Sequence, residues 1–307
     1  MAEPADCPLC GAPLGPTGVS ARDRLVSGEG PFRVWECRAC RFGAVRVTDL
    51  ARYYGGAYFE SFYEHQRSGT LTALERLRLR YREWAARRRF SRVPLGVEGL
   101  AVGRVLDVGC GGGELLGHYA SLGWEAFGVD VSEEAASAAR ARGAQVHVGT
   151  LADGPWEPAS FDLVVYSHAL EHIPGPLEEM RRARKLLKDG GRLVILAPNW
   201  RSWQRFAFRS FWFPLDLPRH VNHFSTRALE RGAQRLELET VAVGTCSTII
   251  AVTYSVHYLI AGRWTPGWKL WLAYAVGLAL YPLVLAIDRV LGGDACYVVL
   301  RRPVTRL

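Results

Sequence analysis

The chain has 307 residues, of which 22% are charged and 49% are hydrophobic, and these proportions are ordinary for a folded globular protein and argue against a disordered chain. Its net charge of +8 indicates an anionic partner, without choosing among nucleic acid, an acidic membrane surface and a phosphorylated substrate. The N-terminal stretch MAEPADCPLC has neither a basic start nor an apolar run. We therefore expect no signal peptide, and a cytoplasmic protein whose seven cysteines are reduced.

Four cysteines near the N-terminus form two C-x-x-C pairs separated by 26 residues. They are Cys7 and Cys10 in CPLC, and Cys37 and Cys40 in CRAC. Two tight turns of this kind can supply four thiolates to one tetrahedral zinc, and we expect Gly11 and Gly43 to permit the turns. The sequence therefore predicts a zinc-ribbon-like module over residues 1–46 that holds a structural zinc, with a redox dithiol as the alternative.

A connector over residues 47–98 follows this module, and its composition changes along its length. Tyrosines gather in 53–63, where Tyr53, Tyr54 and Tyr58 either fold as a lid over a ligand or pack between the modules. The stretch 74–90 has apolar residues at helical spacing and arginine at many of the other positions. Such a helix would either dock on the rest of the protein and leave one face in solvent, or form a surface that binds anionic lipid or RNA.

Strands and helices then alternate along the chain. Short buried strands are predicted over 104–109, 124–130, 145–149, 161–167 and 192–198, with helices after the first, second and fourth of them. The last of these helices is expected to run from 176 to the glycines at 190 and 191. Two further strands, 238–244 and 295–302, come at the end. This alternation predicts a mostly parallel sheet with helices on both faces.

The stretch VLDVGCGGGELL, residues 105–116, carries the first chemical signal. A strand leads directly to Gly109, Gly111 and Gly113, and a helix begins after them, so the backbone can approach a ligand closely. An acid lies within this strand, and Asp130 ends the next one in FGVDVS. A carboxylate at that second position is well placed to accept hydrogen bonds from ribose hydroxyls.

In order and spacing, VLDVGCGGG, GVDVS, FDLVVYSHALEHIPGP and LLKDGGRLVILAPN resemble the class I S-adenosylmethionine-dependent methyltransferases. The resemblance covers about residues 100–245 and returns at the final strand, 295–302. It implies an α/β fold over 99–307, with a Rossmann-like, doubly wound sheet of seven strands. The acid within the first strand and the segment EHIPGP argue against a dehydrogenase that binds NAD.

The resemblance also implies positions for the methyl donor. Asp107, Gly109 and Gly111 would line the methionine end of S-adenosylmethionine, and Asp130 would bind the ribose. By the same resemblance, the adenine and the transferable methyl group lie beside residues at the ends of later strands. These are Thr150 and Leu151 for the adenine, and Ser167 and His168 for the methyl group.

The segment LDLPRHVNHFS, residues 215–225, resembles a subgroup of bacterial methyltransferases that act on small molecules and cell-surface glycans. It follows the fifth strand, where this fold usually builds its acceptor site, and it carries Asp216, Arg219, His220 and His223. Histidine is the natural general base near neutral pH. We favour His220 and His223 for this role and also keep His168, whereas we expect His172 to orient its loop.

An apolar region lies between the last two strands. The uncharged run 270–287 is about as long as a membrane-spanning helix, but a single crossing would separate two strands that share one sheet. The second uncharged run, 247–262, predicts instead a helical hairpin inserted over 247–291. This hairpin would dip into one leaflet, cover an apolar acceptor pocket or pack on a second copy in a homodimer.

Together these features predict an enzyme that transfers a methyl group from S-adenosylmethionine to a small-molecule, glycan or lipid-linked acceptor. We expect it in the cytoplasm, with peripheral contact at the inner face of the membrane through 247–291. One alternative is an RNA methyltransferase, since CPLCGAPL resembles the zinc module of a ribosomal RNA guanine methyltransferase family. The apolar hairpin argues against a nucleic acid partner. A non-catalytic scaffold with a methyltransferase fold is the other alternative.

Overall fold

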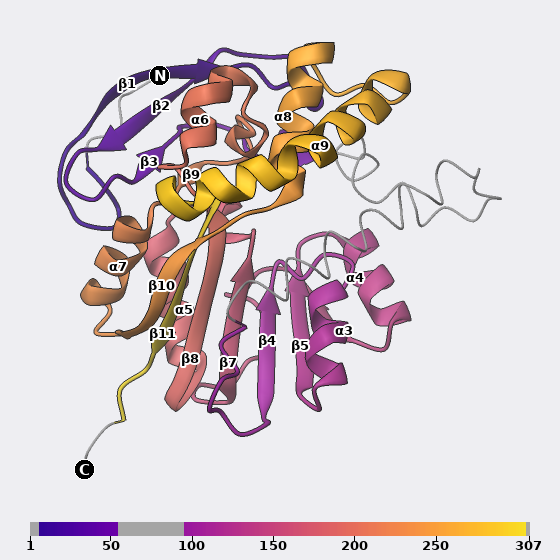
Figure 1. Ribbon diagram of the computed structural model, residues 1–307. Helices are drawn as coiled ribbons and strands as arrows, with labels where there is room; N and C mark the ends of the chain where they lie inside the picture. The colour runs from indigo at the N-terminus through magenta and orange to yellow at the C-terminus, as the bar shows by residue number, and fades with distance from the viewer. Residues whose placement is uncertain (1–5, 55–94, 305–307) are drawn as a thin grey trace.

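The computed structural model describes residues 6–54 and 95–304 (Figure 1). The predictions for the arginine-rich stretch 74–90 and for Tyr58 lie outside these residues.

A sheet of seven strands forms the centre of the larger domain, in the order β10-β11-β8-β7-β4-β5-β6. Neighbouring strands from β8 to β6 run parallel, whereas β11 is antiparallel to both β8 and β10. The strands are β4 (Arg104–Val108), β5 (Glu125–Asp130), β6 (Gln145–Val148), β7 (Phe161–Ser167), β8 (Leu187–Pro198), β10 (Glu239–Cys246) and β11 (Ala295–Arg301). The predicted seven-stranded, mostly parallel sheet is confirmed.

Helices cover both faces of this sheet, because successive residues of a strand point to opposite sides. Leu106 of β4 points to the side where α5 and α7 pack, and Val105 points to the side where α3 packs. The helices are α3 (Glu114–Ser121), α4 (Glu133–Ala141), α5 (Pro176–Leu186) and α7 (Thr226–Arg235). The doubly wound arrangement is therefore also confirmed.

The helix predicted from residue 176 was wrong at its C-terminal end. It ends at Leu186, and Leu187 already belongs to β8, where it pairs with Phe161 of β7. Leu187 and the residues after it join β8 instead of extending the helix, because Asp189, Gly190 and Gly191 are weak helix formers.

A second, four-stranded sheet joins the N-terminal residues to the larger domain. Its order is β1-β2-β3-β9, with β1 (Leu14–Ala21), β2 (Phe32–Cys37), β3 (Gly43–Ala44) and β9 (Asn222–His223). Strand β2 ends at Cys37, the first cysteine of the second C-x-x-C pair. Strand β9 comes from the segment after β8, so the N-terminal strands share a sheet with residues almost 180 positions later in the chain.

The predicted hairpin is present between β10 and β11, as α8 (Ile249–Ala261) and α9 (Trp268–Leu291). In Figure 1 the N-terminal sheet, α6 (Trp203–Phe208) and this hairpin lie together above the carboxyl ends of the parallel strands. Short 3₁₀ turns connect these parts: η1 (Ala51–Tyr54), η3 (Leu170–His172), η4 (Arg209–Phe211) and η5 (Phe213–Leu215). This end of the sheet is where ligands bind in open α/β folds.

Candidate active site

The glycine-rich loop between β4 and α3 adopts a conformation that favours glycine. Gly109, Gly111 and Gly113 all have positive φ, at 72°, 53° and 80°. A Cβ on Gly109 would lie 2.6 Å from the Cβ of Ala169, so this glycine also lets the loop pack directly on the turn after β7. The loop that is predicted to hold the methyl donor therefore touches the segment that carries His168.

Asp130 is the last residue of β5, and its side chain is hydrogen-bonded to this loop. Its carboxylate accepts hydrogen bonds from the backbone N–H groups of Gly111 and Ser132, each at 2.9 Å. Burial raises the pKa of Asp130, and these backbone donors offset part of that rise. Each carboxylate oxygen has a second lone pair. The carboxylate can therefore also accept hydrogen bonds from a ribose, so the residues present fit the predicted nucleoside.

The other residues predicted around the donor lie at the ends of neighbouring strands. Asp107 is buried within β4, and Leu151 is buried in the main hydrophobic core. Thr150 is exposed, and its backbone N–H and its hydroxyl donate to one carboxylate oxygen of Asp153 at 2.6 and 2.8 Å. Ser167 is the last residue of β7 and is half-buried. Their roles toward a donor remain predictions.

His168 follows β7 and is paired with a buried carboxylate. It has a positive φ of 58°, which is rare for a residue with a Cβ. Its backbone N–H donates to the carbonyl oxygen of Leu196 at 2.8 Å. Its Nδ1 lies 3.4 Å from Oε1 of Glu171, and the two side chains are 28% and 1% exposed. Burial alone would raise the pKa of Glu171, but His168 and the nearby imidazoles lower it to about 2. Glu171 is therefore an ionised partner that can orient His168.

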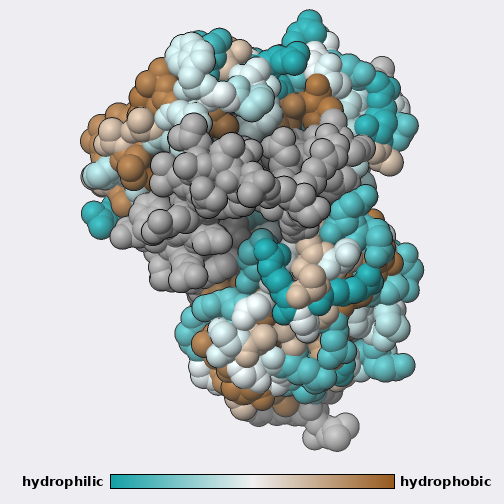
Figure 2. All heavy atoms as spheres, turned by 90° about the vertical axis from the view of Figure 1, so that its right-hand side faces the viewer, coloured by the Kyte–Doolittle hydropathy of each residue, from teal (hydrophilic) through white to brown (hydrophobic). Residues whose placement is uncertain are grey.

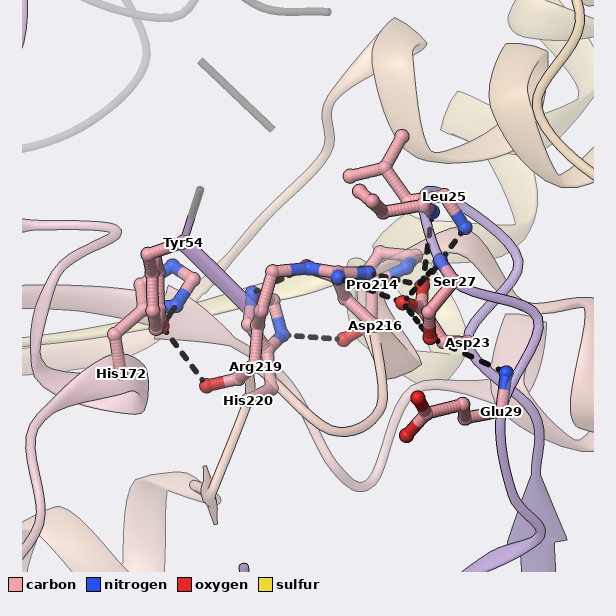
Figure 3. A network of polar contacts seen from close by, with 11 residues as sticks. Asp23, Leu25, Ser27, Glu29, Tyr54, His172, Pro214, Asp216, Arg219 and His220 are labelled. Atoms are coloured by element: carbon pink, nitrogen blue, oxygen red, sulfur yellow. Dashed lines mark hydrogen bonds and ion pairs between the residues drawn. The ribbon is translucent and has the colours of Figure 1, made fainter. Parts of the chain in front are cut away.

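Two more histidines lie beside this pair, and their ring nitrogens are fixed by oxygen partners (Figure 3). The Tyr54 hydroxyl donates to the carbonyl of Arg219 at 3.2 Å, so it accepts from Nδ1 of His172 at 2.8 Å. The Nδ1 of His220 donates to the carbonyl of Pro214 at 2.8 Å. Burial lowers the pKa of His172 to about 4, so its ring is neutral near pH 7 and keeps its lone pair on Nε2. The ring centroids of the two histidines lie 4.6 Å apart.

Three of these side chains could together hold a divalent cation. Glu171, His172 and His220 each offer one ligand atom, and these atoms lie within 4.8 Å of one another. Two imidazoles and a carboxylate suit metals such as Zn²⁺ or Fe²⁺. The H-x-x-H spacing of His220 and His223 permits metal binding, but the sequence carried no prediction of a metal there. The structure instead groups His220 with a carboxylate that sequence reasoning left out.

His223 of β9 is enclosed by other residues. Its side chain is 1% exposed, and its ring centroid lies 4.9 Å from that of Trp200. Within the described residues its Nε2 has no hydrogen-bond partner. Burial, together with the charges of His220 and Arg205, lowers its pKa to about 3. His223 is a neutral imidazole at neutral pH, and its burial does not favour the role of general base.

The four N-terminal cysteines converge as predicted. The Sγ atoms of Cys7 and Cys40 lie 3.5 Å apart, those of Cys10 and Cys37 lie 3.4 Å apart, and all four lie within 4.8 Å of one another. A tetrahedral zinc with bonds of about 2.3 Å separates its sulfurs by roughly 3.8 Å, so the thiols fit this metal. The two knuckles match each other: Gly11 N–H donates to the Cys7 carbonyl and Arg41 N–H to the Cys37 carbonyl, both at 2.8 Å.

The expectation that Gly43 forms the second knuckle was wrong. That position is taken by Arg41, which has a positive φ of 62°. Gly43 lies in β3, where a Cβ would be 3.0 Å from the Cβ of His223 and 3.2 Å from Val34. The glycine is therefore needed for the close pairing of β3 with β9.

An ion-pair network joins the N-terminal residues to the 215–225 segment (Figure 3). Arg219 is fully buried, and its guanidinium donates to Asp23 at 2.8 and 3.2 Å and to Asp216 at 2.6 Å. Asp23 also accepts from the backbone N–H groups of Leu25 and Ser27 at 3.0 and 2.9 Å. Asp216 and Arg219 thus hold two parts of the chain together. The acceptor-site location that the sequence suggested for them stays a prediction.

We predict that the protein loses stability in mild acid, because two of its histidines are buried. Burial, with the charge of His220, lowers the pKa of His172 to about 4, and the pKa of His223 is about 3. Between pH 6.5 and 4 the unfolded chain binds more protons, so the free energy of unfolding falls as pH falls. Each of these two histidines should lower the free energy of unfolding at pH 5 by about 2 kcal/mol relative to its value at pH 7. Denaturant titrations at pH 7 and pH 5 measure this loss, and the pH dependence of His223→Phe should be smaller by about that amount.

With this geometry in view, comparison with known proteins identifies the family. A family model described as a methyltransferase domain matches residues 63–243, more than half of the chain. The chain therefore belongs to the methyltransferase domain family, and the predicted resemblance to S-adenosylmethionine-dependent methyltransferases is confirmed.

Individual relatives agree with this assignment. The ubiquinone biosynthesis O-methyltransferase of Idiomarina loihiensis is 32% identical over 161 residues, which is 48% of this chain and 65% of that protein. The enzyme of the same name from Xanthomonas euvesicatoria is 40% identical over 107 residues, covering 33% of this chain and 45% of its own length. The chain thus spans less than two thirds of the length of these curated relatives.

A solved structure shares the fold. A chain in the complex between the Haloferax volcanii Trm112 methyltransferase activator and a methyltransferase aligns with 74% of this chain and 97% of its own length. The TM-score is 0.50 at 18% sequence identity, which shows a common fold.

Proposed function

We propose that the protein transfers a methyl group from S-adenosylmethionine to a hydroxyl oxygen of a small, lipid-linked acceptor, with His168 as the general base. One observation carries this proposal. The glycine loop predicted to hold the donor packs on Ala169, and the neighbouring His168 is held by the buried carboxylate of Glu171. Donor loop and base therefore occupy adjoining positions at the carboxyl end of β7.

The donor site follows the family pattern. We assign Asp107 and the three glycines 109, 111 and 113 to the methionine end, and Asp130 to the ribose. Thr150 and Leu151 are assigned to the adenine, and Ser167 to the methyl group. When bound, S-adenosylmethionine supplies a methyl group on a sulfonium, which is an excellent leaving group. The protein then needs to align the acceptor, which can lower the barrier by about 7–11 kcal/mol in favourable cases.

His168 is the strongest candidate for removing the acceptor proton. Of the three histidines predicted as bases, His220 and His223 are buried, whereas His168 keeps part of its surface accessible. Its Nδ1 faces Glu171, so the opposite nitrogen is the one that can accept a proton from a hydroxyl. Glu171 then stabilises the imidazolium as it forms, as a carboxylate does in a histidine-based catalytic pair.

Two observations favour an apolar, hydroxyl-bearing acceptor over a glycan. The curated relatives are named ubiquinone biosynthesis O-methyltransferases. The hairpin above the carboxyl ends of the strands is built almost entirely from apolar residues. An apolar covering of this kind suits a lipid-linked ring better than a sugar.

The proposal is tested by incubating the protein with S-adenosylmethionine labelled in the methyl group, a catechol that carries an isoprenoid chain, and bacterial RNA. We expect the label to appear in the organic phase as a methyl ether. Label in the RNA fraction would support the RNA methyltransferase alternative. A well-folded protein that binds neither S-adenosylmethionine nor S-adenosylhomocysteine would support the scaffold alternative.

The base assignment predicts a specific loss of rate. His168→Ala should lower kcat by about 10²- to 10⁴-fold, because a positioned general base contributes about that much. Binding of S-adenosylhomocysteine should change little. His118→Ala on α3 serves as the matched control and should keep its full kcat. Equal kcat values for His168→Ala and the unmodified enzyme would contradict the role.

We also propose that the four-cysteine cluster holds one structural zinc. Elemental analysis should find about one zinc per chain. Cys37→Ser should lose the metal and lower the melting temperature, since Cys37 is fully buried in the main core. Cys110→Ser, which alters a buried thiol outside the cluster, should keep the metal. Metal-free protein whose Cys7–Cys40 and Cys10–Cys37 pairs oxidise reversibly would instead support the redox dithiol.

A further inference from the structure

The two helices of the hairpin differ in burial, and this difference decides how the hairpin can meet a membrane. Helix α8 is largely buried inside the protein, and its 13 residues span about 20 Å. The hydrocarbon core of a bilayer is about 30 Å thick. By length and composition α9 could cross a membrane, but β10 and β11 pair along their length and bring both ends of the hairpin to one sheet edge. A crossing hairpin is therefore excluded by α8.

Helix α9 instead exposes one continuous apolar face. One residue of every turn faces outward, and these are Trp268, Leu272, Ala275, Ala279, Leu283, Ala286 and Val290. The exposed fractions of Leu272, Leu283 and Val290 are 44%, 59% and 81%. This uncharged face is about 33 Å long at 1.5 Å per residue. In Figure 2, hydrophobic residues gather at the upper left of the molecule, on the side that is the front of Figure 1, where α9 lies.

The opposite face of α9 is held firmly by the protein. Gly277 allows the two helices to approach closely, because a Cβ there would lie 2.2 Å from Oγ1 of Thr253. Near the C-terminal end, Asp288 accepts a hydrogen bond from the indole of Trp203 at 2.5 Å. The helix is thus fixed on the molecule, and its apolar face points outward as part of a rigid surface.

The hairpin has positively charged residues on its surface and one acid, which is buried. Residues 247–291 contain a single acid, Asp288, and it is 7% exposed. The basic residues Arg263, Lys269 and Arg289 flank the two ends of α9. The exposed charges that the hairpin places at the ends of this apolar face are therefore positive and match an anionic surface.

We propose that α9 docks flat on an anionic lipid bilayer. Its apolar face enters one leaflet to the depth of the headgroup and acyl boundary, as interfacial helices do. Arg263, Lys269 and Arg289 meet the phosphate groups, and Trp268 lies at the interface, where tryptophan is enriched. The docking does not depend on methyl transfer.

A second copy of the chain fits this surface less well. A twofold dimer places the same patch against itself. If two α9 helices packed antiparallel, Lys269 of each would approach Arg289 of the other; if they packed parallel, like ends would meet. Neither arrangement brings an exposed acid of 247–291 to the basic ends of α9. The phosphate groups of an anionic lipid supply the negative charge that a second copy lacks there.

Vesicle flotation tests the proposal with purified full-length protein. We expect the protein to float with vesicles of phosphatidylcholine mixed with phosphatidylglycerol, and much less with phosphatidylcholine alone. Arg263→Gln/Lys269→Gln/Arg289→Gln should weaken binding by roughly 100-fold, at about fivefold for each basic residue. Leu272→Glu/Leu283→Glu should abolish it. Val102→Glu is the matched control, since Val102 is 61% exposed before β4, and it should bind like the unmodified protein.

Three results would overturn the proposal, given variants whose circular dichroism matches that of the unmodified protein. Absence of flotation with anionic vesicles would exclude lipid as the partner. A dimer in light scattering that Leu283→Glu converts to a monomer, together with no flotation, would assign the face to a second copy. Resistance of the bound protein to alkaline washing would show that α9 is inserted across the bilayer.

Discussion

Replacing Asp130 by alanine should weaken the binding of S-adenosylhomocysteine by roughly 10²- to 10⁴-fold, the value of two hydrogen bonds to a charged group. The carboxylate stands at the end of β5 and accepts from Gly111 and Ser132, so its loss removes the proposed ribose contacts and also loosens the glycine loop. Isothermal titration calorimetry measures the change in affinity directly.

The matched control for Asp130 is Glu133→Ala. Glu133 is an exposed carboxylate three residues later, and it pairs with Arg140 on the surface of α4. Its removal should leave the affinity for S-adenosylhomocysteine within about twofold, as expected for an exposed ion pair. Unmodified affinity in Asp130→Ala would show that the ribose binds elsewhere.

Replacing Arg219 by methionine should lower the free energy of unfolding by about 3–5 kcal/mol, the usual cost of leaving a buried charge without its partner. Asp23 and Asp216, whose side chains are 0% and 10% exposed, would then lose the guanidinium that they share. Denaturant unfolding measures the loss. Because Arg219 connects residues 196 positions apart, we expect the N-terminal sheet to become susceptible to proteolysis first.

Two further variants test whether the loss of stability in Arg219→Met comes from the buried ion-pair network. Arg140→Met breaks an exposed pair on α4 and should cost less than about 1 kcal/mol. Arg219→Met/Asp23→Leu removes one of the stranded carboxylates and should recover part of the loss. A cost below about 1 kcal/mol for Arg219→Met would mean that the network contributes little to stability.

The central sheet could be predicted from sequence because its signals are local. A short apolar strand, a glycine-rich turn and a helix follow one another within the 105–116 stretch, and Asp130 ends the next strand at the expected spacing. The hairpin could be predicted by a different argument. Because the strands on either side of 247–291 must share a sheet, a single membrane crossing between them is excluded, and the pairing of β10 with β11 agrees with this.

The contacts between distant segments could not be predicted in this way. Strand β9 has only two residues, Asn222 and His223, and such a strand has no sequence pattern until β3 lies beside it. The pairing of Asp23 with Arg219 likewise depends on how the chain returns to its beginning. Glu171 was visible in the segment EHIPGP, but its burial and its contact with His168 come from the turn after β7.

The most direct test is an experimental structure of the protein with S-adenosylhomocysteine bound. We predict that the ribose hydroxyls lie within hydrogen-bond distance of the Asp130 carboxylate. We also predict that the homocysteine lies along residues 107–113, with its sulfur directed toward His168. A nucleoside bound away from Asp130, or a sulfur directed away from the end of β7, would contradict the proposed site.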